Sequence, residues 1–221
     1  MNPGQVLKEI HNFTEALVGL SLSNEQNYPA THGDVKGAFE ITVSNASAMS
    51  VALKKLAYHY IYAELEAARC FNIKMLDGAL IIFRYRFQAG AICEHSLGYF
   101  PSPDLEHFQN EPELYLADDV YADVIARNIV PFPVRFDYSD DPAKFIDIHH
   151  PYSHLTLGQY ENCRIPVCSP LSPLAFGGFL LRSFYNTAYR KYSEDIPVSV
   201  GVFAKTITDN ERKIPHVMFG V

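Results

Sequence analysis

Residues 80–87 read LIIFRYRF, and this segment constrains the fold more than any other part of the chain. Its second half alternates aromatic residues with arginines, so an extended strand here has one apolar face and one cationic face. The dipeptide Asp77-Gly78 just before it favours a type I′ hairpin turn, because both central residues of that turn have positive φ. Residues 91–100 then have the composition of a second strand, which ends at Pro101. The sequence therefore predicts two or three adjacent antiparallel strands in this region.

Helical patterns lie on both sides of the hairpin. Apolar residues recur near helical spacing over 3–19, helix-forming residues dominate 48–69, and a third helix is expected over 173–192. Residues 21–36 have the composition of a surface loop, and residues 104–127 that of short helices, with 120–127 as the best candidate. Further strands are expected at 38–43, 131–138, 144–148, 163–167 and 198–203.

Runs of strands with helices before and after them predict an α+β fold. We expect an antiparallel (mixed) sheet of about five to seven strands flanked by three main helices. The chain of 221 residues is expected to form a single domain, with an N-terminal helical part over 1–72 and the sheet plus C-terminal helix over 73–221. A domain of this size buries enough surface to fold without a metal or disulfide.

Charge and cysteine content narrow the functional classes. The net charge of −7 and the isoelectric point near 5.7 disfavour nonspecific binding to duplex DNA, which requires a basic surface. The four cysteines include no CxxC pair, so we expect reduced thiols. We find no signal peptide and no run of 18 apolar residues, so a cytoplasmic location without membrane contact is expected.

Polar residues crowd into the segment 134–164, where three of the nine histidines fall within six residues. Strand alternation places Arg135 and Asp137 on one face. A basic and an acidic group beside imidazoles are typical of a site for proton transfer or phosphate binding. The candidate catalytic residues are Arg135, Asp137, His150 and His154.

Several chemistries fit this cluster. In a metal-free phosphodiester cleavage, the imidazoles act as general base and acid, and Arg135 or Arg164 stabilises the charge on phosphorus. In a metal site, His150 and His154 are ligands together with a carboxylate. In a structural interpretation, the imidazoles and Ser153 bond to backbone groups of a loop; ligand binding without chemistry is a fourth possibility. The carboxylates considered for the metal site are Asp137, Asp147 and Glu94.

A second group of polar residues lies on the two predicted hairpin strands. Arg84 and Arg86 either form a cross-strand ion pair with Glu94 or join His95 in a cationic pocket that continues the histidine cluster. Gln159 and Arg164 either contact substrate or hold an irregular segment in place. The candidate substrate-binding residues are Arg84, Arg86, His95, Gln159 and Arg164.

Motifs for common cofactors and catalytic machineries are missing from the sequence. It contains no GxGxxG, GxxxxGK[ST], HExxH or GxSxG pattern. We therefore set aside dinucleotide-dependent dehydrogenases, P-loop NTPases, zincins and α/β-hydrolases, and we expect no cofactor.

The segment HHPYSHLTLGQYENCRIPV over 149–167, preceded by LDGALIIFRYRF and SLGYFPSP, resembles the family called domain of unknown function 2290. The resemblance extends from about Leu76 to about Tyr192 and implies a bacterial or phage-associated intracellular protein, with no activity attached. A fainter similarity is to small TumE-type toxins of toxin–antitoxin pairs, which are thought to act on RNA. It is carried by Arg135, Asp137, His149, His150 and His154.

These observations lead to two functional hypotheses. The first is a metal-independent ribonuclease of a toxin–antitoxin or phage-defence system, with a metal-dependent hydrolase as a weaker variant. The second is a non-enzymatic accessory or protein-binding subunit, in which the histidine cluster is structural. The expected partner is RNA or a protein encoded nearby, and the oligomeric state stays open.

Overall fold

The computed structural model describes residues 1–33, 37–104, 131–199 and 201–219. At its centre is an antiparallel sheet of nine strands in the order β1-β4-β5-β6-β7-β8-β9, with β3 also paired to β5 and β2 paired to β3. The helices of the described residues are α1 (Pro3–Gly19), η1 (Ala46–Leu53), α2 (Tyr58–Ala67), α5 (Pro173–Phe184), α6 (Asn186–Lys191) and η2 (Glu211–Lys213). The strands are β1 (Ser23–Gln26), β2 (Ala30–Gly33), β3 (Ala38–Thr42), β4 (Ile73–Met75), β5 (Leu80–Gln88), β6 (Ala91–Phe100), β7 (Val134–Ser139), β8 (Ser153–Leu157) and β9 (Ile165–Pro166). The predicted α+β class is confirmed.

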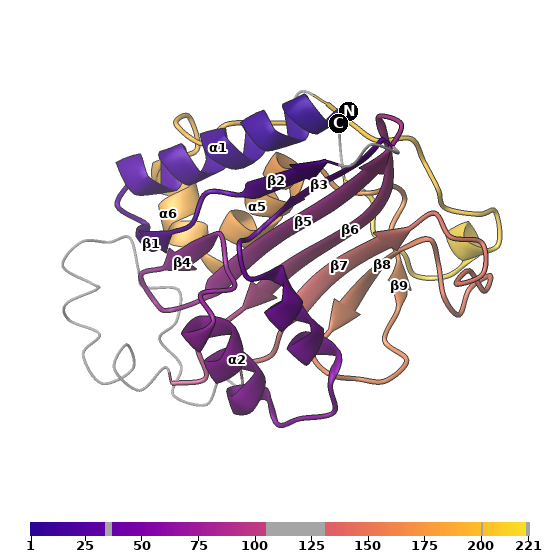
Figure 1. Ribbon diagram of the computed structural model, residues 1–221, viewed down its shortest axis with the longest axis horizontal. Helices are drawn as coiled ribbons and strands as arrows, with labels where there is room; N and C mark the ends of the chain where they lie inside the picture. Colours follow the sequence, from indigo (N-terminus) through magenta and orange to yellow (C-terminus); the bar gives the residue numbers. More distant parts are fainter. Residues whose placement is uncertain (34–36, 105–130, 200, 220–221) are drawn as a thin grey trace.

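One face of the sheet is covered by α1, α5 and α6 (Figure 1). Alternate residues of β5 and β7 point into this layer, among them Phe83, Tyr85 and Phe136, which are all but fully buried. The helix α1 begins at Pro3 with a capping box from Asn2, and its apolar stripe packs on this core. This layer is the larger of the two hydrophobic cores.

The opposite face is covered by η1 and α2, but only over part of its length (Figure 1). A smaller core forms there between Ile61 and Leu65 of α2 and the residues Leu80, Ile82 and Phe100 of the sheet. The rest of this face carries polar side chains. It is therefore the face on which a cleft can form.

The hairpin β5–β6 is confirmed, and the hairpin turn expected at Asp77-Gly78 is present, but the predicted turn type is wrong. The expected type I′ turn requires two residues with positive φ, and only Gly78 has one, at 81°. The carboxylate of Asp77 instead accepts hydrogen bonds from the backbone of Ala79 and the hydroxyl of Tyr185, which holds Asp77 in an ordinary conformation. The turn joins β4 to β5.

Other expected elements also differ. Residues 21–36 contain the strands β1 and β2 where a loop was expected, because their backbones pair with β4 and β3. Residues 144–148 form a turn closed by the bridge between Ile146 and His150 where a strand was expected, and β7 pairs with β6 and β8. The expected helix 48–69 is interrupted between η1 and α2, and the expected helix 173–192 breaks at Tyr185. Residues 198–203 form no strand in the described part, and the short helices expected over 104–127 lie outside it from residue 105 onward.

Candidate functional site

The amino-acid pattern of β5 explains where the site lies. Residues 80–83 are buried on both faces of the sheet, whereas from Arg84 onward only alternate residues are buried. The first half therefore sits between both helical layers, and the second half has one face that no helix covers. Arg84 marks the point at which the η1–α2 layer ends.

Strand register brings polar residues of four strands into rows across this uncovered face. The pairs Arg84–Ser96, Ser96–Asp137 and Asp137–His154 are direct cross-strand neighbours, so these four side chains share a face. The adjacent row contains Ile82, Gly98, Arg135 and Thr156. The predicted shared face of Arg135 and Asp137 agrees with the alternating burial of β7.

A cleft of about 1050 Å³ lies over these rows. Six lysine and arginine side chains and four carboxylates line it, so it is locally more cationic than the chain, whose net charge is −7. Arg86 is not part of its lining. The residues of the predicted site that do line it are Arg84, His95, Arg135, Asp137, His150, His154, Gln159 and Arg164.

His154 lies on the floor of the cleft, on strand β8, and is 8% exposed. Its Nδ1 lies 3.2 Å from the carbonyl oxygen of Pro151, and a carbonyl can only accept, so Nδ1 carries the proton. The Nε2 atom is left to contact a ligand in the cleft. Burial lowers the pKa of His154 below its ordinary value, and His150 and Arg164 lower it further, against the raising effect of Asp137. The ring is therefore a neutral base at neutral pH.

His150 is held in the same way from the loop that precedes β8. Its Nδ1 makes a short hydrogen bond with the carbonyl oxygen of Lys144, and its ring centroid lies 5.2 Å from that of His154. The loop is tight: Ile148 has a φ of 69°, which is strained for a β-branched residue. Two imidazoles thus stand side by side, each with Nδ1 bound to backbone.

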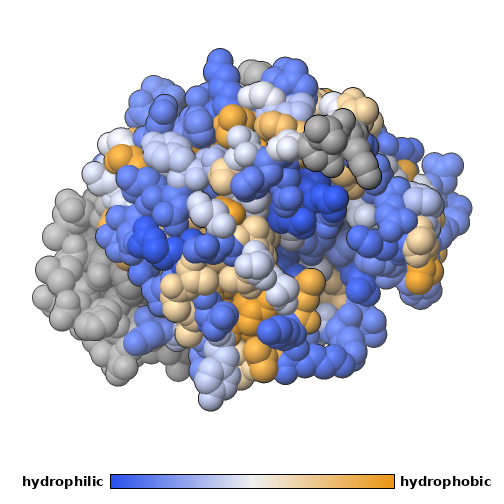
Figure 2. All heavy atoms as spheres, viewed as in Figure 1, coloured by the Kyte–Doolittle hydropathy of each residue, from blue (hydrophilic) through white to orange (hydrophobic). Residues whose placement is uncertain are grey.

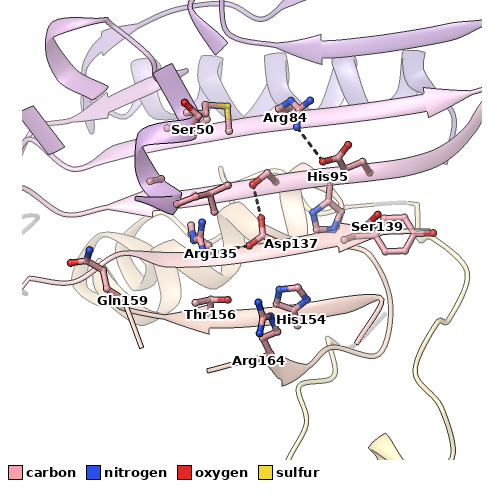
Figure 3. A pocket seen from close by; sticks show the side chains of 18 of the residues that line it. Ser50, Arg84, His95, Arg135, Asp137, Ser139, His154, Thr156, Gln159 and Arg164 are labelled. Atoms are coloured by element: carbon pink, nitrogen blue, oxygen red, sulfur yellow. Dashed lines mark hydrogen bonds and ion pairs between the residues drawn. The ribbon is translucent and has the colours of Figure 1, made fainter. Parts of the chain in front are cut away.

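Arg135, Asp137 and Arg164 lie around His154 in the cleft (Figure 3). The Asp137 carboxylate accepts a hydrogen bond of 2.6 Å from the hydroxyl of Ser96 and lies 3.9 Å from the Arg135 guanidinium. Arg164 has no side-chain hydrogen bond or ion pair within the part of the chain that the structure describes. Arg164 is therefore available to an anion in the cleft, and Arg135 has only the long contact of 3.9 Å to Asp137.

His95 has a different position from the one expected. It is 1% exposed, and it alternates with Glu94 and Ser96 so that its ring enters the helix-covered core. Its Nε2 accepts from the backbone of Leu171, which leaves Nδ1 to donate to the carbonyl of Phe136. Burial lowers its pKa to about 4. Because both ring nitrogens are occupied, the expected substrate contact of His95 does not fit its position.

The arginines of β5 are engaged with carboxylates. Arg84 Nε donates to Glu40 at 2.7 Å, and Arg86 donates to Glu94 at 2.7 Å, with Glu94 also 3.4 Å from Arg84. These contacts correspond to the cross-strand ion pair, which was one of the two alternatives expected for Arg84 and Arg86. Arg84 lies at the edge of the cleft with its charge already compensated.

Gln159 joins two sides of the cleft. Its side chain donates to the carbonyl oxygen of Leu56 at 2.6 Å, and Lys55 forms an ion pair of 2.7 Å with Glu161. Both contacts link the η1–α2 connection to the β8–β9 loop. Gln159 therefore shapes the cleft through a backbone contact.

Sequence reasoning missed several lining residues. Ser96 lies opposite Asp137 because of the β6–β7 register, which no local pattern reveals. Phe145 and Tyr152 form a stacked pair, with centroids 4.3 Å apart and planes 8° apart, at the ends of the loop that carries His150. The exposed Tyr160 stands on the β8–β9 loop.

The metal interpretation of the cluster loses Asp147, one of its three alternative carboxylates. Asp147 accepts hydrogen bonds from Thr208 and Asn210, away from the histidine pair. Within the described residues, no group of three or more His, Cys, Asp or Glu side chains is placed to hold a metal ion.

Comparison with known proteins gives a family and no activity. The family model described as "Uncharacterized conserved protein (DUF2290)" matches residues 22–219, nearly the whole chain. The chain belongs to the DUF2290 family. The search of curated proteins and the search of solved structures found no match to this DUF2290 protein. Within the described residues, its helices are too short or too polar to cross a bilayer.

Proposed function

We propose that the cleft is the active site of a metal-independent ribonuclease that cleaves by general acid–base catalysis. The observation that carries the proposal is the pair His150–His154, in which backbone carbonyls hold both Nδ1 atoms so that both Nε2 atoms are left for one ligand. Such a pair can remove and deliver a proton in one reaction. A role in a toxin–antitoxin or phage-defence system belongs to the same proposal.

The chemistry assigns one imidazole as the general base and the other as the general acid. His154, neutral because burial lowers its pKa, takes the proton of a ribose 2′-hydroxyl. The 2′-oxygen forms a bond to phosphorus as the bond to the 5′-oxygen breaks, and protonated His150 gives its proton to that leaving oxygen. The products are a 2′,3′-cyclic phosphate and a 5′-hydroxyl end, and solvent exchange restores both rings.

Arg135 and Arg164 supply the electrostatic part of this reaction. The phosphorus carries additional negative charge in the transition state, and fixed guanidinium groups stabilise it. Asp137 positions Arg135 and raises the proton affinity of His154. These roles need no metal ion.

The test is cleavage of a single-stranded oligoribonucleotide by purified protein in the presence of EDTA. His150→Asn and His154→Asn should each lower the rate by about 10²- to 10⁴-fold, the usual contribution of a general acid or base. His149→Asn is the matched control, because His149 is exposed and outside the cleft. A substrate with a single 2′-deoxy nucleotide at the cleaved position should resist cleavage.

Melting temperatures decide how a loss of activity is interpreted. The proposal requires the two variants to melt near the wild type while cleavage is lost. If the wild-type protein leaves RNA intact, or if both variants cleave normally, the site has no such activity.

A second candidate function, a protein-binding subunit, is favoured by exposed apolar side chains in and beside the cleft. Leu53, Leu56 and Tyr60 are exposed around the η1–α2 connection, and Figure 2 shows hydrophobic residues gathered over this region. Exposed apolar groups of this kind often mark protein contacts. Loss of partner binding on Leu53→Ser, with histidine variants unaffected, would favour this function over the ribonuclease.

A further inference from the structure

The cleft is narrowed by contacts between two segments far apart in the sequence. The η1–α2 connection and the β8–β9 loop meet through the Gln159–Leu56 hydrogen bond and the Lys55–Glu161 ion pair. All four residues line the cleft. Access to its floor is therefore restricted on this side.

The histidine pair lines the same cleft, near the start of β8, whereas Gln159 follows the end of that strand (Figure 3). Since His154 is 8% exposed, a phosphodiester must enter the cleft to reach its Nε2 atom. An A-form duplex presents a broad, stiff surface, and proteins that bind it recognise its shape over an extended area. A cleft of about 1050 Å³ has instead the size of a ligand pocket, which accepts a few nucleotides of a splayed strand.

Aromatic side chains line the cleft from the segments that precede and follow strand β8. The stacked rings of Phe145 and Tyr152 line the cleft next to Lys144, whose carbonyl holds His150. Tyr160, which is 77% exposed, lines it from the β8–β9 loop. Aromatic rings beside cationic groups are the usual platform for unpaired bases, because every base has a face that can stack.

We propose that the cleft accepts single-stranded RNA and excludes duplex RNA. The nucleotide on one side of the scissile phosphate places its base against the Phe145–Tyr152 pair, and a base on the other side meets Tyr160. Arg135 and Arg164 hold the phosphate between them. The inference rests on the proposed function for its chemistry, but binding can be measured without cleavage.

The experiment is fluorescence anisotropy with a labelled 2′-O-methyl oligonucleotide, which lacks the attacking hydroxyl and stays intact. The single strand should bind at least roughly ten-fold more tightly than the same strand annealed to its complement. Tyr152→Leu and Tyr160→Leu should each weaken binding by roughly five- to a hundred-fold, the range for loss of one base–aromatic stack. Tyr152→Phe keeps the ring and should bind like the wild type.

Tyr28→Leu is the matched control, because Tyr28 is exposed and outside the cleft. A second readout uses 2-aminopurine in the oligonucleotide, whose fluorescence falls on stacking; the chain contains no tryptophan to interfere. Quenching should persist in Tyr152→Phe and weaken in Tyr160→Leu, and melting curves identify any variant that does not fold.

Equal or tighter binding of the duplex overturns the inference, as does single-strand binding that neither folded leucine variant weakens. Binding of the single strand without cleavage of an unmodified one rejects the ribonuclease and leaves the binding site in place. Cleavage of single-stranded and duplex RNA at equal rates has the opposite meaning: the ribonuclease stands and the strand preference fails.

Discussion

Three histidines of this chain show how the local environment separates chemical from structural roles. His150 and His154 each have one ring nitrogen bound to a carbonyl and the other left for the cleft. His95 has both nitrogens bound to backbone groups inside the core. Only the first two have an atom to offer a substrate.

The buried neutral ring of His95 predicts a pH-dependent stability. In the unfolded chain its pKa is near 6.5, and in the folded protein burial lowers it to about 4, so the unfolded state binds a proton first as pH falls. Stability is therefore full above pH 6.5 and falls between pH 6.5 and 4. Between pH 7.5 and 5.0 we expect His95 to account for a loss of about 2 kcal/mol.

Urea unfolding at these two pH values measures the effect. His95→Gln should be less stable than the wild type at pH 7.5 and should lose about 2 kcal/mol less on acidification. The exposed His149→Gln should keep the wild-type dependence. An unchanged dependence in His95→Gln would mean that other groups cause the acid sensitivity.

Among the elements, the contact between α1 and α5 fixes the helical layer over the main core. Gly177 of α5 faces Phe13 of α1, and a Cβ atom on Gly177 would lie 2.5 Å from the Phe13 ring. Phe13 is fully buried between this helix and the sheet, so its ring has no space to withdraw. The close approach of the two helices depends on this glycine.

Gly177→Ala should therefore destabilise the protein by about 1–3 kcal/mol, as over-packing does elsewhere. The adjacent Gly178→Ala is the control, because its Cβ would meet nothing within 4 Å. That variant should gain about 0.5–1 kcal/mol from the helix preference of alanine. Chemical denaturation of both proteins checks the prediction, which fails if the two substitutions have the same sign.

Strand pairing explains which elements could be predicted from the sequence and which could not. The alternation in β5 and β7 is local, so the apolar and polar faces of these strands followed from the residues alone. The segment 144–148 looked like a strand by composition, but β7 pairs with β8 and leaves 144–148 as the turn that carries His150. Several segments can compete to pair with one strand, and amino-acid composition does not decide which of them does so.

At the level of the whole molecule, an acidic chain surrounds a cleft with more cations than carboxylates. The electrostatic field of the whole acidic chain repels nucleic acid, whereas the field inside the cleft attracts a single anion or a short strand. We therefore expect oligonucleotide binding to depend on few phosphate contacts and on the conformation of the nucleic-acid strand.

The salt dependence of oligonucleotide binding tests this arrangement. Arg135→Gln and Arg164→Gln should each reduce the slope of log K against log salt by roughly 0.7 to 1, the effect of one phosphate contact. Arg182→Gln, exposed on the helix-covered side, should leave the slope unchanged. Equal slopes in all four proteins would place the phosphate outside the cleft.

By itself, the sequence determined the α+β class, the helix α1, the hairpin β5–β6 and the shared face of Arg135 and Asp137. These features depend on neighbours along the chain, whose spacing sets which way each side chain points. The tertiary structure decided that Asp137 lies opposite both Ser96 and His154, that His95 enters the core, and that Gln159 reaches Leu56. Such contacts join residues separated by tens of positions, and they form only when long-range strand register and packing select one arrangement.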